Sequence, residues 1–167
     1  MTRLKKYALA FSVFVFCIMA GCAPRQRIVL ELDQYLAHPE AYKQYDVIIS
    51  ARVNDILERY DDYRNKRVQV TAPFEYFGHY GFWTWHIMLN DNGNRLRCYS
   101  HHYRISAEWD AKNLLMRARA AGKPITVNGL LYRDGIDILE ITYDDQIVRP
   151  HVKPVRVYPW LWHYPFW

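Results

Sequence analysis

Hydrophobic and polar residues alternate with a period of two through much of the second half of the chain. Val68 and Val70 alternate with polar neighbours between Arg67 and Thr71, and the run from Phe82 to Leu89 is rich in aromatic residues. Such alternation places successive side chains on opposite faces of a β-strand. The pattern predicts five strands, at residues 67–77, 82–90, 95–101, 124–132 and 136–143.

Two of the junctions between these strands carry tight-turn signals. Asn92-Gly93 separates the second and third strands, and Asp134-Gly135 separates the fourth and fifth. Both dipeptides suit two-residue β-hairpins because their residues tolerate a positive φ. The sequence therefore predicts two antiparallel hairpins.

A single helix is predicted between the two hairpins. Ser106 is a plausible N-cap for a helix from Ala107 to Ala121, and Gly122 follows as a stop. The order of three strands, one helix and two strands resembles the OB-fold. We therefore expect a mainly β protein, a small OB-like Greek-key barrel with its one helix between the third and fourth strands.

The segment before the barrel gives less uniform signals. Residues 32–42 suggest a helix interrupted at His38-Pro39, where the proline could open a new turn. Residues 47–53 are rich in β-branched side chains but also fit a helical stripe, so periodicity leaves strand and helix both open. We expect this extension to join the barrel core at residues 67–143 in one domain, residues 32–148.

The N-terminus has the three parts of a signal peptide. Arg3, Lys5 and Lys6 precede an apolar run that ends in Met19-Ala20-Gly21-Cys22. The run is shorter than the roughly 20 apolar residues that a membrane-spanning helix needs. Small residues before a cysteine resemble the lipobox of bacterial lipoproteins, which implies cleavage of residues 1–21 and acylation of Cys22. Residues 22–31 would then form a tether.

Cleavage would change the charge and the cysteine chemistry of the chain. The signal peptide holds three of the 22 basic residues and none of the 17 acidic ones, so the mature protein keeps a net charge of only +2. A nucleic-acid-binding protein usually carries a basic stripe, and we predict no nucleic-acid partner. Cys98 would be the one remaining thiol, which excludes an intramolecular disulfide and suits a small buried strand residue.

A family resemblance follows from the mature sequence. The segment His38-Pro39-Glu40-Ala41-Tyr42 before a strand, the mixed β core and the Trp- and Tyr-rich end are similar to the starvation-inducible outer-membrane lipoproteins. The resemblance implies a lipid-anchored place in the cell envelope, with the outer membrane as the destination. The long aromatic insert from Tyr76 to Trp85 departs from that family, and the resemblance implies no catalytic motif.

Candidate ligand-binding residues lie in two aromatic segments. Aromatic faces stack on sugars or bases, but the same rings can fill a barrel core, and both readings remain open for the first segment. In the C-terminal tail, residues 149–167, repeated prolines exclude a regular helix, and the tail is expected to lie on its own domain, a partner or the membrane interface. The candidates are Tyr76, Tyr80, Trp83, Trp85, Trp160 and Trp162.

The sequence offers little that would support catalysis. No nucleophile elbow, phosphate loop or zinc-hydrolase motif is present, so we predict neither an enzyme nor a cofactor. His79, His86 and His101 are the residues that would form a metal site if there were one. The leading hypothesis is a noncatalytic binding or structural module that contacts an envelope protein or glycan; the alternative is a small metal-binding or hydrolytic lipoprotein.

Overall fold

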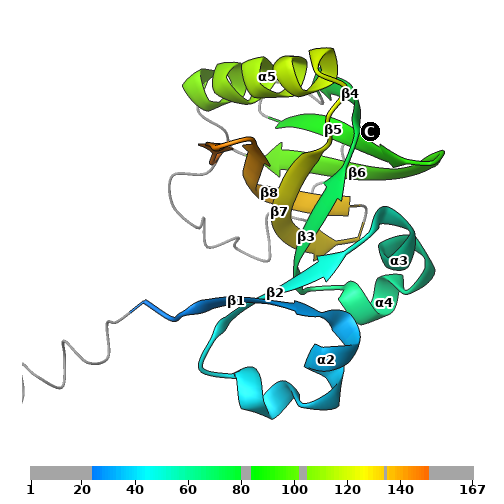
Figure 1. Ribbon diagram of the computed structural model, residues 1–167, viewed down its shortest axis with the longest axis vertical. Coiled ribbons are helices and arrows are strands. Elements are labelled where there is room, and N and C mark those ends of the chain that lie inside the picture. Colours follow the sequence, from blue (N-terminus) through cyan, green and yellow to red (C-terminus); the bar gives the residue numbers. More distant parts are fainter. Residues whose placement is uncertain (1–23, 80–83, 102–104, 134, 151–167) are drawn as a thin grey trace, which may run out of the picture.

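The computed structural model describes residues 24–79, 84–101, 105–133 and 135–150, and of His101, Ile105 and Ser106 only the backbone. The described chain is mainly β, with its strands joined in one continuous sheet and a long helix across one end (Figure 1). The predicted signal peptide, Cys22 and most of the C-terminal tail lie outside the described residues. No helix of the described part is long and apolar enough to cross a membrane.

Six strands form the barrel. They are β3 (Arg67–Ala72), β4 (Phe74–His79), β5 (Thr84–Asp91), β6 (Asn94–His101), β7 (Ile125–Tyr132) and β8 (Gly135–Tyr143). Their spatial order is β3-β7-β8-β6-β5-β4, with β6 and β8 parallel and the other pairs antiparallel. Because β4 continues from β3, this order closes on itself. The topology is that of the OB-fold, which confirms the predicted fold class.

The predicted first strand, residues 67–77, is divided in two by Pro73. The break separates β3 from β4, and the Pro73 carbonyl accepts a hydrogen bond from the Asn90 amide at 3.0 Å. A proline has no N–H to donate to a strand ladder, so it suits a corner better than a continuous strand. The bend lets one stretch of chain pair with β7 through its first half and with β5 through its second half.

The hairpin between β5 and β6 confirms the Asn-Gly prediction. Asp91 and Asn94 are paired across the turn, and Asn92 and Gly93 have φ values of 53° and 92°. A second backbone feature shapes the other hairpin, where the ladder between β7 and β8 is irregular at Asn128 and Gly129. A Cβ at Gly129 would collide with the Asp137 carbonyl, so only glycine allows the strands to approach this closely.

Helix α5 (Ile105–Ala120) confirms that a helix follows the first hairpin, and it covers one end of the barrel (Figure 1). The helix begins before Ser106, so the prediction that Ser106 is its N-cap is wrong. It buries Ala111, Leu114, Leu115 and Ala118 in the same core as the barrel interior. Short helices α3 (Val53–Glu58) and α4 (Tyr60–Tyr63) add Val53, Ile56 and Tyr63 to that core, and α3 packs against β5 and β6. One hydrophobic core therefore joins the barrel and the preceding segment.

The N-terminal extension adds strands to the outside of β3. Strand β2 (Asp46–Ala51) pairs with β3 in parallel, so the ambiguous segment forms a strand that ends before α3. Strand β1 (Arg27–Glu31) pairs in parallel with β2, which corrects the prediction that residues 22–31 are only a tether. Between β1 and β2 lie α2 (Leu32–Ala37) and the 3-10 helix η1 (Pro39–Tyr42), divided at His38 as predicted.

A buried carboxylate binds the extension to the barrel. Glu140 on β8 contacts Arg27 of β1 at 3.0 Å, Arg67 of β3 at 3.5 Å and Arg149 at 2.8 Å. Arg149 follows the short strand β9 (Gln146–Val148), which pairs with the end of β8. Burial of a carboxylate requires such charged partners. The two ends of the described chain therefore meet the barrel at one ion-pair network.

Candidate binding face and neighbouring clefts

Trp85 is a core residue. Its side chain is 0% exposed and its ring stacks on Phe77, with the ring centroids 5.5 Å apart. Alternation along β5 directs Trp85, Ile87 and Leu89 inward. The prediction that Trp85 contributes to a ligand surface is therefore wrong, because its side chain points into the barrel and is fully buried there.

Tyr76, a predicted ligand-binding residue, lies on the outside of the barrel. It is 53% exposed, and its ring lies 5.5 Å from that of His86 on β5. A side chain at Gly78, the register partner of His86, would collide with the Tyr76 ring. The glycine thus leaves room for an aromatic ring to lie flat along the strands.

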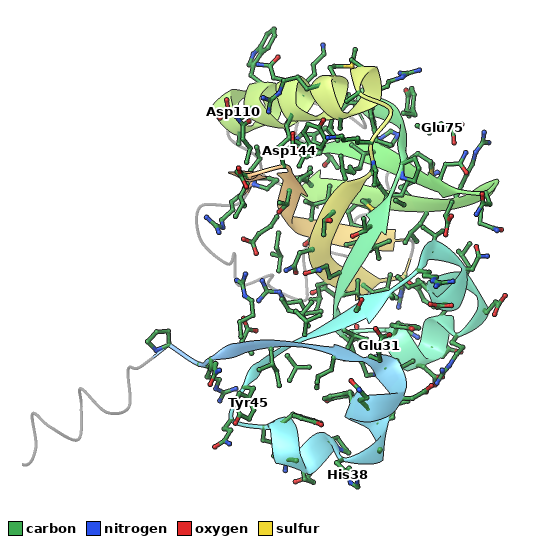
Figure 2. All side chains as sticks on the ribbon, viewed as in Figure 1. Glu31, His38, Tyr45, Glu75, Asp110 and Asp144 are labelled. Atoms are coloured by element: carbon green, nitrogen blue, oxygen red, sulfur yellow. The ribbon has the colours of Figure 1, made fainter. Side chains whose placement is uncertain are left out.

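A bulge in β4 widens the outward surface. The ladder shifts between Phe74 and Tyr76, and the extra residue, Glu75, is also directed toward the outside. Glu75 accepts hydrogen bonds from Arg95 at 2.6 and 2.9 Å and from Asn90 at 2.9 Å. Figure 2 shows Glu75 at the edge of the molecule beside β4. These contacts hold the border of the surface in place.

The surface continues across β6. His86 is paired with Tyr99, and Met88 with Arg97, so these four side chains share the face opposite to Trp85 and Cys98. Arg97 is exposed, and no ion pair holds it among the described residues. We call Tyr76, His86, Met88, Arg97 and Tyr99 the outer face. Strands β5 and β6 correspond to the second and third strands of an OB-fold, and β4 to the second half of the first. OB-folds bind oligosaccharides and oligonucleotides on this face.

His86 is favoured in its neutral form on this face. Partial burial, followed by the positive charges of Arg97 and His79, lowers the pKa of His86 from its ordinary value of 6.5. A neutral imidazole can both donate and accept a hydrogen bond. At neutral pH the outer face therefore offers aromatic rings, a guanidinium group and a neutral hydrogen-bonding ring.

A cleft of about 300 Å³ lies between β4 and α5 and reaches the outer face at Tyr76. We call it the β4–α5 cleft. Aromatic residues of β4 form one side and long side chains of α5 form the other. Its lining residues are Phe74, Tyr76, Phe77, His79, Lys112, Leu115, Met116 and Arg119.

The only acid that approaches this cleft from α5 in the described structure is already engaged. His79 contacts Glu108, with Nε2 and Oε1 2.5 Å apart. Lys112 lies over the Trp109 ring at 5.7 Å from its centroid, and neither Lys112 nor Arg119 has an ion pair within the described residues. The cleft therefore combines aromatic side chains with two cations that have no ion-pair partner among the described residues.

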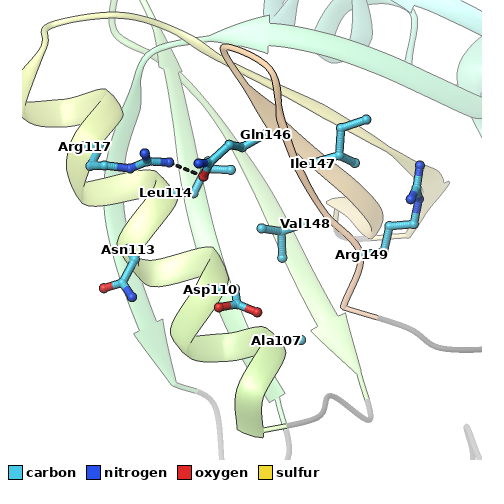
Figure 3. Close-up of a pocket in the computed structure, with 9 residues that line it drawn as sticks. All are labelled: Ala107, Asp110, Asn113, Leu114, Arg117, Gln146, Ile147, Val148 and Arg149. Carbon is cyan, nitrogen blue, oxygen red and sulfur yellow. Dashed lines mark hydrogen bonds between the residues drawn. The ribbon is translucent and has the colours of Figure 1, made fainter.

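A larger cleft, about 590 Å³, lies between α5 and β9, on another side of the helix (Figure 3). Of its polar groups, Arg117 donates a hydrogen bond to Gln146, and Arg149 contacts the buried Glu140, which does not line the cleft. None of the predicted ligand-binding residues lines it. We place the candidate site on the outer face, despite the larger volume of this cleft, because the outer face carries the exposed Tyr76 ring and the exposed Arg97 guanidinium group.

The remaining predicted residues divide into two groups. Cys98 is buried, as predicted, and burial raises the pKa of its thiol far above the ordinary value, which makes it a poor nucleophile. In the part of the chain that the structure describes, no three metal-ligating side chains converge. Outside the described residues lie Cys22, Tyr80, Trp83, Trp160 and Trp162, together with the side chain of His101.

Several members of the site were not singled out from the sequence. Arg97 and Tyr99 could have been found, because placing Cys98 inward forces both outward on the same strand. Lys112 and Arg119 are seven residues apart on α5, but nothing in the sequence shows that they face β4. That proximity depends on how the helix packs across the barrel.

Comparisons with known proteins add no specific relative. No family model and no curated protein matches the chain. Among solved structures, it is similar to apo TiaS, a tRNA agmatidine synthetase, at 11% identity and a TM-score of 0.38, over 56% of this chain and 20% of that one. It is also similar to the structure of yeast Stn1 and Ten1, at 10% identity and a TM-score of 0.30, over 77% of this chain and 65% of that one. The chain thus spans less than two thirds of either protein's matched chain.

Proposed function

We propose that this protein is a noncatalytic, lipid-anchored module of the bacterial cell envelope that binds an oligosaccharide on its outer face. The observation that carries the proposal is the half-exposed Tyr76 ring, which lies beside His86 on the strands that OB-folds use for ligands. A flat aromatic surface can stack on a sugar ring, while neighbouring polar groups bond its hydroxyls. The anchor is Cys22, and the proposed destination is the outer membrane.

A glycan is favoured over a nucleic acid by location and charge. The signal-peptide pattern at the N-terminus would place the mature chain outside the cytoplasm, and removal of residues 1–21 would reduce the net charge to +2. Nucleic-acid affinity depends strongly on positive charge, because it arises largely from phosphate contacts. The resemblance to starvation-inducible outer-membrane lipoproteins supports the same compartment.

The experiment is a titration of the purified, full-length protein in detergent with the hexamer of N-acetylglucosamine. Tyr76→Ala should weaken binding by about 10-fold, the effect of losing about 1.4 kcal/mol from an aromatic contact. Leu36→Ala is the control, since Leu36 is also exposed but lies on α2, away from the outer face. No binding by the unsubstituted protein, or tighter binding of single-stranded oligo(dT), would contradict the proposal.

The alternative, a metal-binding or hydrolytic lipoprotein, is tested on the same preparation. Elemental analysis should find no stoichiometric metal. One equivalent of zinc or copper that disappears in His79→Ala would favour the alternative and contradict a role in glycan binding alone.

A further inference from the structure

The outward side of α5 carries an unusual set of exposed residues. Trp109 is 61% exposed and Met116 is 51% exposed, and Lys112 and Arg119 alternate with them along the helix. Residues spaced by three and four lie on one helical face. Lys112, Met116 and Arg119 also line the β4–α5 cleft, so this helix face borders the cleft rather than only facing solvent.

Among the described residues, the positive charges around the cleft are not balanced by acidic side chains. Glu108 is held by His79, and Glu75 is held by Arg95 and Asn90. Within the described chain, Lys112, Arg119 and Arg97 have no acidic partner in an ion pair. The cleft and the adjoining part of the outer face therefore present three positive charges beside the aromatic rings of Phe74, Tyr76 and Phe77. This arrangement complements a ligand that has both ring faces and negative charges.

The spacing of the helix cations suits a ligand with more than one negative charge. Lys112 and Arg119 are seven residues apart, which separates them by about 10.5 Å along the helix axis. Both side chains line the same cleft, so their positive charges are spread along its α5 side. An elongated chain with acidic groups at intervals can meet each in turn, while Tyr76 connects the cleft to the outer face.

We propose that the β4–α5 cleft is a subsite for the acidic groups of a carboxylated polysaccharide, whose neutral sugar rings extend onto the outer face. This inference rests on the proposed function and names the chemistry of its ligand. Lys112 and Arg119 bind the carboxylates, and Arg97 lies where the next part of the glycan would pass. Discrimination between acidic and neutral glycans is thus assigned to α5, and affinity for sugar rings to β4–β6.

The test compares two glycans of equal length on the full-length protein in detergent. One is the neutral hexamer of N-acetylglucosamine, and the other is the hyaluronan hexasaccharide, in which glucuronic acid alternates with N-acetylglucosamine. The unsubstituted protein should bind the acidic glycan about 10-fold more tightly at low ionic strength, and the difference should shrink as salt is added. The double variant Lys112→Gln/Arg119→Gln should lose this preference and bind both glycans alike.

The matched control is the double variant Lys43→Gln/Arg64→Gln, which removes two exposed cations from the N-terminal extension. It should keep the full preference for the acidic glycan. Neutral-glycan binding reports whether the α5 variant is folded, because Tyr76 and His86 are intact in it. An unchanged acidic preference in Lys112→Gln/Arg119→Gln, or an equal loss in the control, would overturn the subsite while leaving the proposed function standing.

Discussion

Trp85 and Tyr76 have opposite roles although both come from one aromatic stretch of the sequence. Trp85 is enclosed by the barrel and stacks on Phe77, whereas Tyr76 lies outside against His86. Composition alone could not separate them, because aromatic residues serve cores and binding surfaces equally well. The bulge at Glu75 shifts the register of β4, and a one-residue shift reverses which side chains point outward.

The contrast between the two rings predicts different effects on stability. Trp85→Ala should lower the free energy of unfolding by about 3–5 kcal/mol, since it leaves a cavity in a packed core. Tyr76→Ala, made as the matched control, should lower it by less than about 1 kcal/mol because the ring is half exposed. Urea denaturation followed by circular dichroism measures both. Equal losses would show that Trp85 is not the core residue described here.

His86 predicts a pH dependence of stability. Its pKa is lowered in the folded protein, so the unfolded chain binds the extra proton more readily than the folded one. Above pH 6.5, the pKa of His86 in the unfolded chain, the contribution of His86 to the free energy of unfolding should be complete. That contribution should be lost as the pH falls from 6.5 toward the lower pKa of His86 in the folded protein. Urea midpoints at intervals between about pH 5 and pH 8 measure this.

In His86→Gln, the urea midpoint should fall less than in the unsubstituted protein as the pH is lowered below 6.5. His38→Gln provides the comparison, because His38 is exposed in the N-terminal extension (Figure 2). A pH profile for His86→Gln that coincides with that of the unsubstituted protein would contradict the assigned environment of His86.

Among the secondary-structure elements, local sequence signals predicted the strands and the helix of the barrel, but they did not predict strand β1 of the N-terminal extension. The Asn92-Gly93 turn and the helix stop at Gly122 act through the backbone of a few neighbouring residues, so the strands and α5 could be placed from them. Strand β1 could not, because Arg27–Glu31 becomes a strand only by pairing with β2. The division between β3 and β4 does have a local signal, because Pro73 cannot donate a hydrogen bond to a strand ladder.

Gly129 offers a test of the contact between β7 and β8. Gly129→Ala should lower the free energy of unfolding by about 1–3 kcal/mol, because the new methyl group would press on the Asp137 carbonyl and force the strands apart. Gly93→Ala is the companion variant: its Cβ would meet open space, and only the positive φ opposes it, at about 1 kcal/mol. A Gly129→Ala protein as stable as the unsubstituted one would contradict the close approach.

Glu140 tests how the extension is fastened to the barrel. Glu140→Gln removes the negative charge that Arg27, Arg67 and Arg149 share, and should lower the free energy of unfolding by about 1–3 kcal/mol, a range that allows for the exposure of two of the arginines. Glu40→Gln, which removes an exposed carboxylate paired only with Lys43, should change little. Hydrogen exchange in β1 should accelerate in the first variant alone. Unchanged exchange there would contradict the role of the network.

Over the whole molecule, the N-terminal extension and α5 lie at opposite ends of the barrel. β1 enters the sheet at the end of the molecule where α2 lies, and α5 covers the opposite end (Figure 1). A membrane anchor at Cys22 would leave α5 and the β4–α5 cleft on the far side from the entry of the chain. The fold class followed from the sequence, whereas the composition of the site depended on register and helix packing, which act between distant segments.

The anchor has its own test. Cys22→Ala should abolish incorporation of labelled palmitate and leave an uncleaved or wrongly processed product, because the thiol is the proposed acceptor of the lipid. Cys17→Ala, which changes the other N-terminal cysteine, should be labelled and processed normally. Labelled lipid and mature size in Cys22→Ala cells would contradict the lipobox assignment.

The most direct test of the central claim is nuclear magnetic resonance mapping of the glycan on the isotope-labelled, full-length protein. On addition of the N-acetylglucosamine hexamer, the largest amide shifts should occur at Tyr76, His86 and Tyr99 on the outer face of β4, β5 and β6. Residues of the α5–β9 cleft, such as Asn113 and Gln146, should shift little. Shifts concentrated in that cleft, or no shifts on the outer face, would contradict the account.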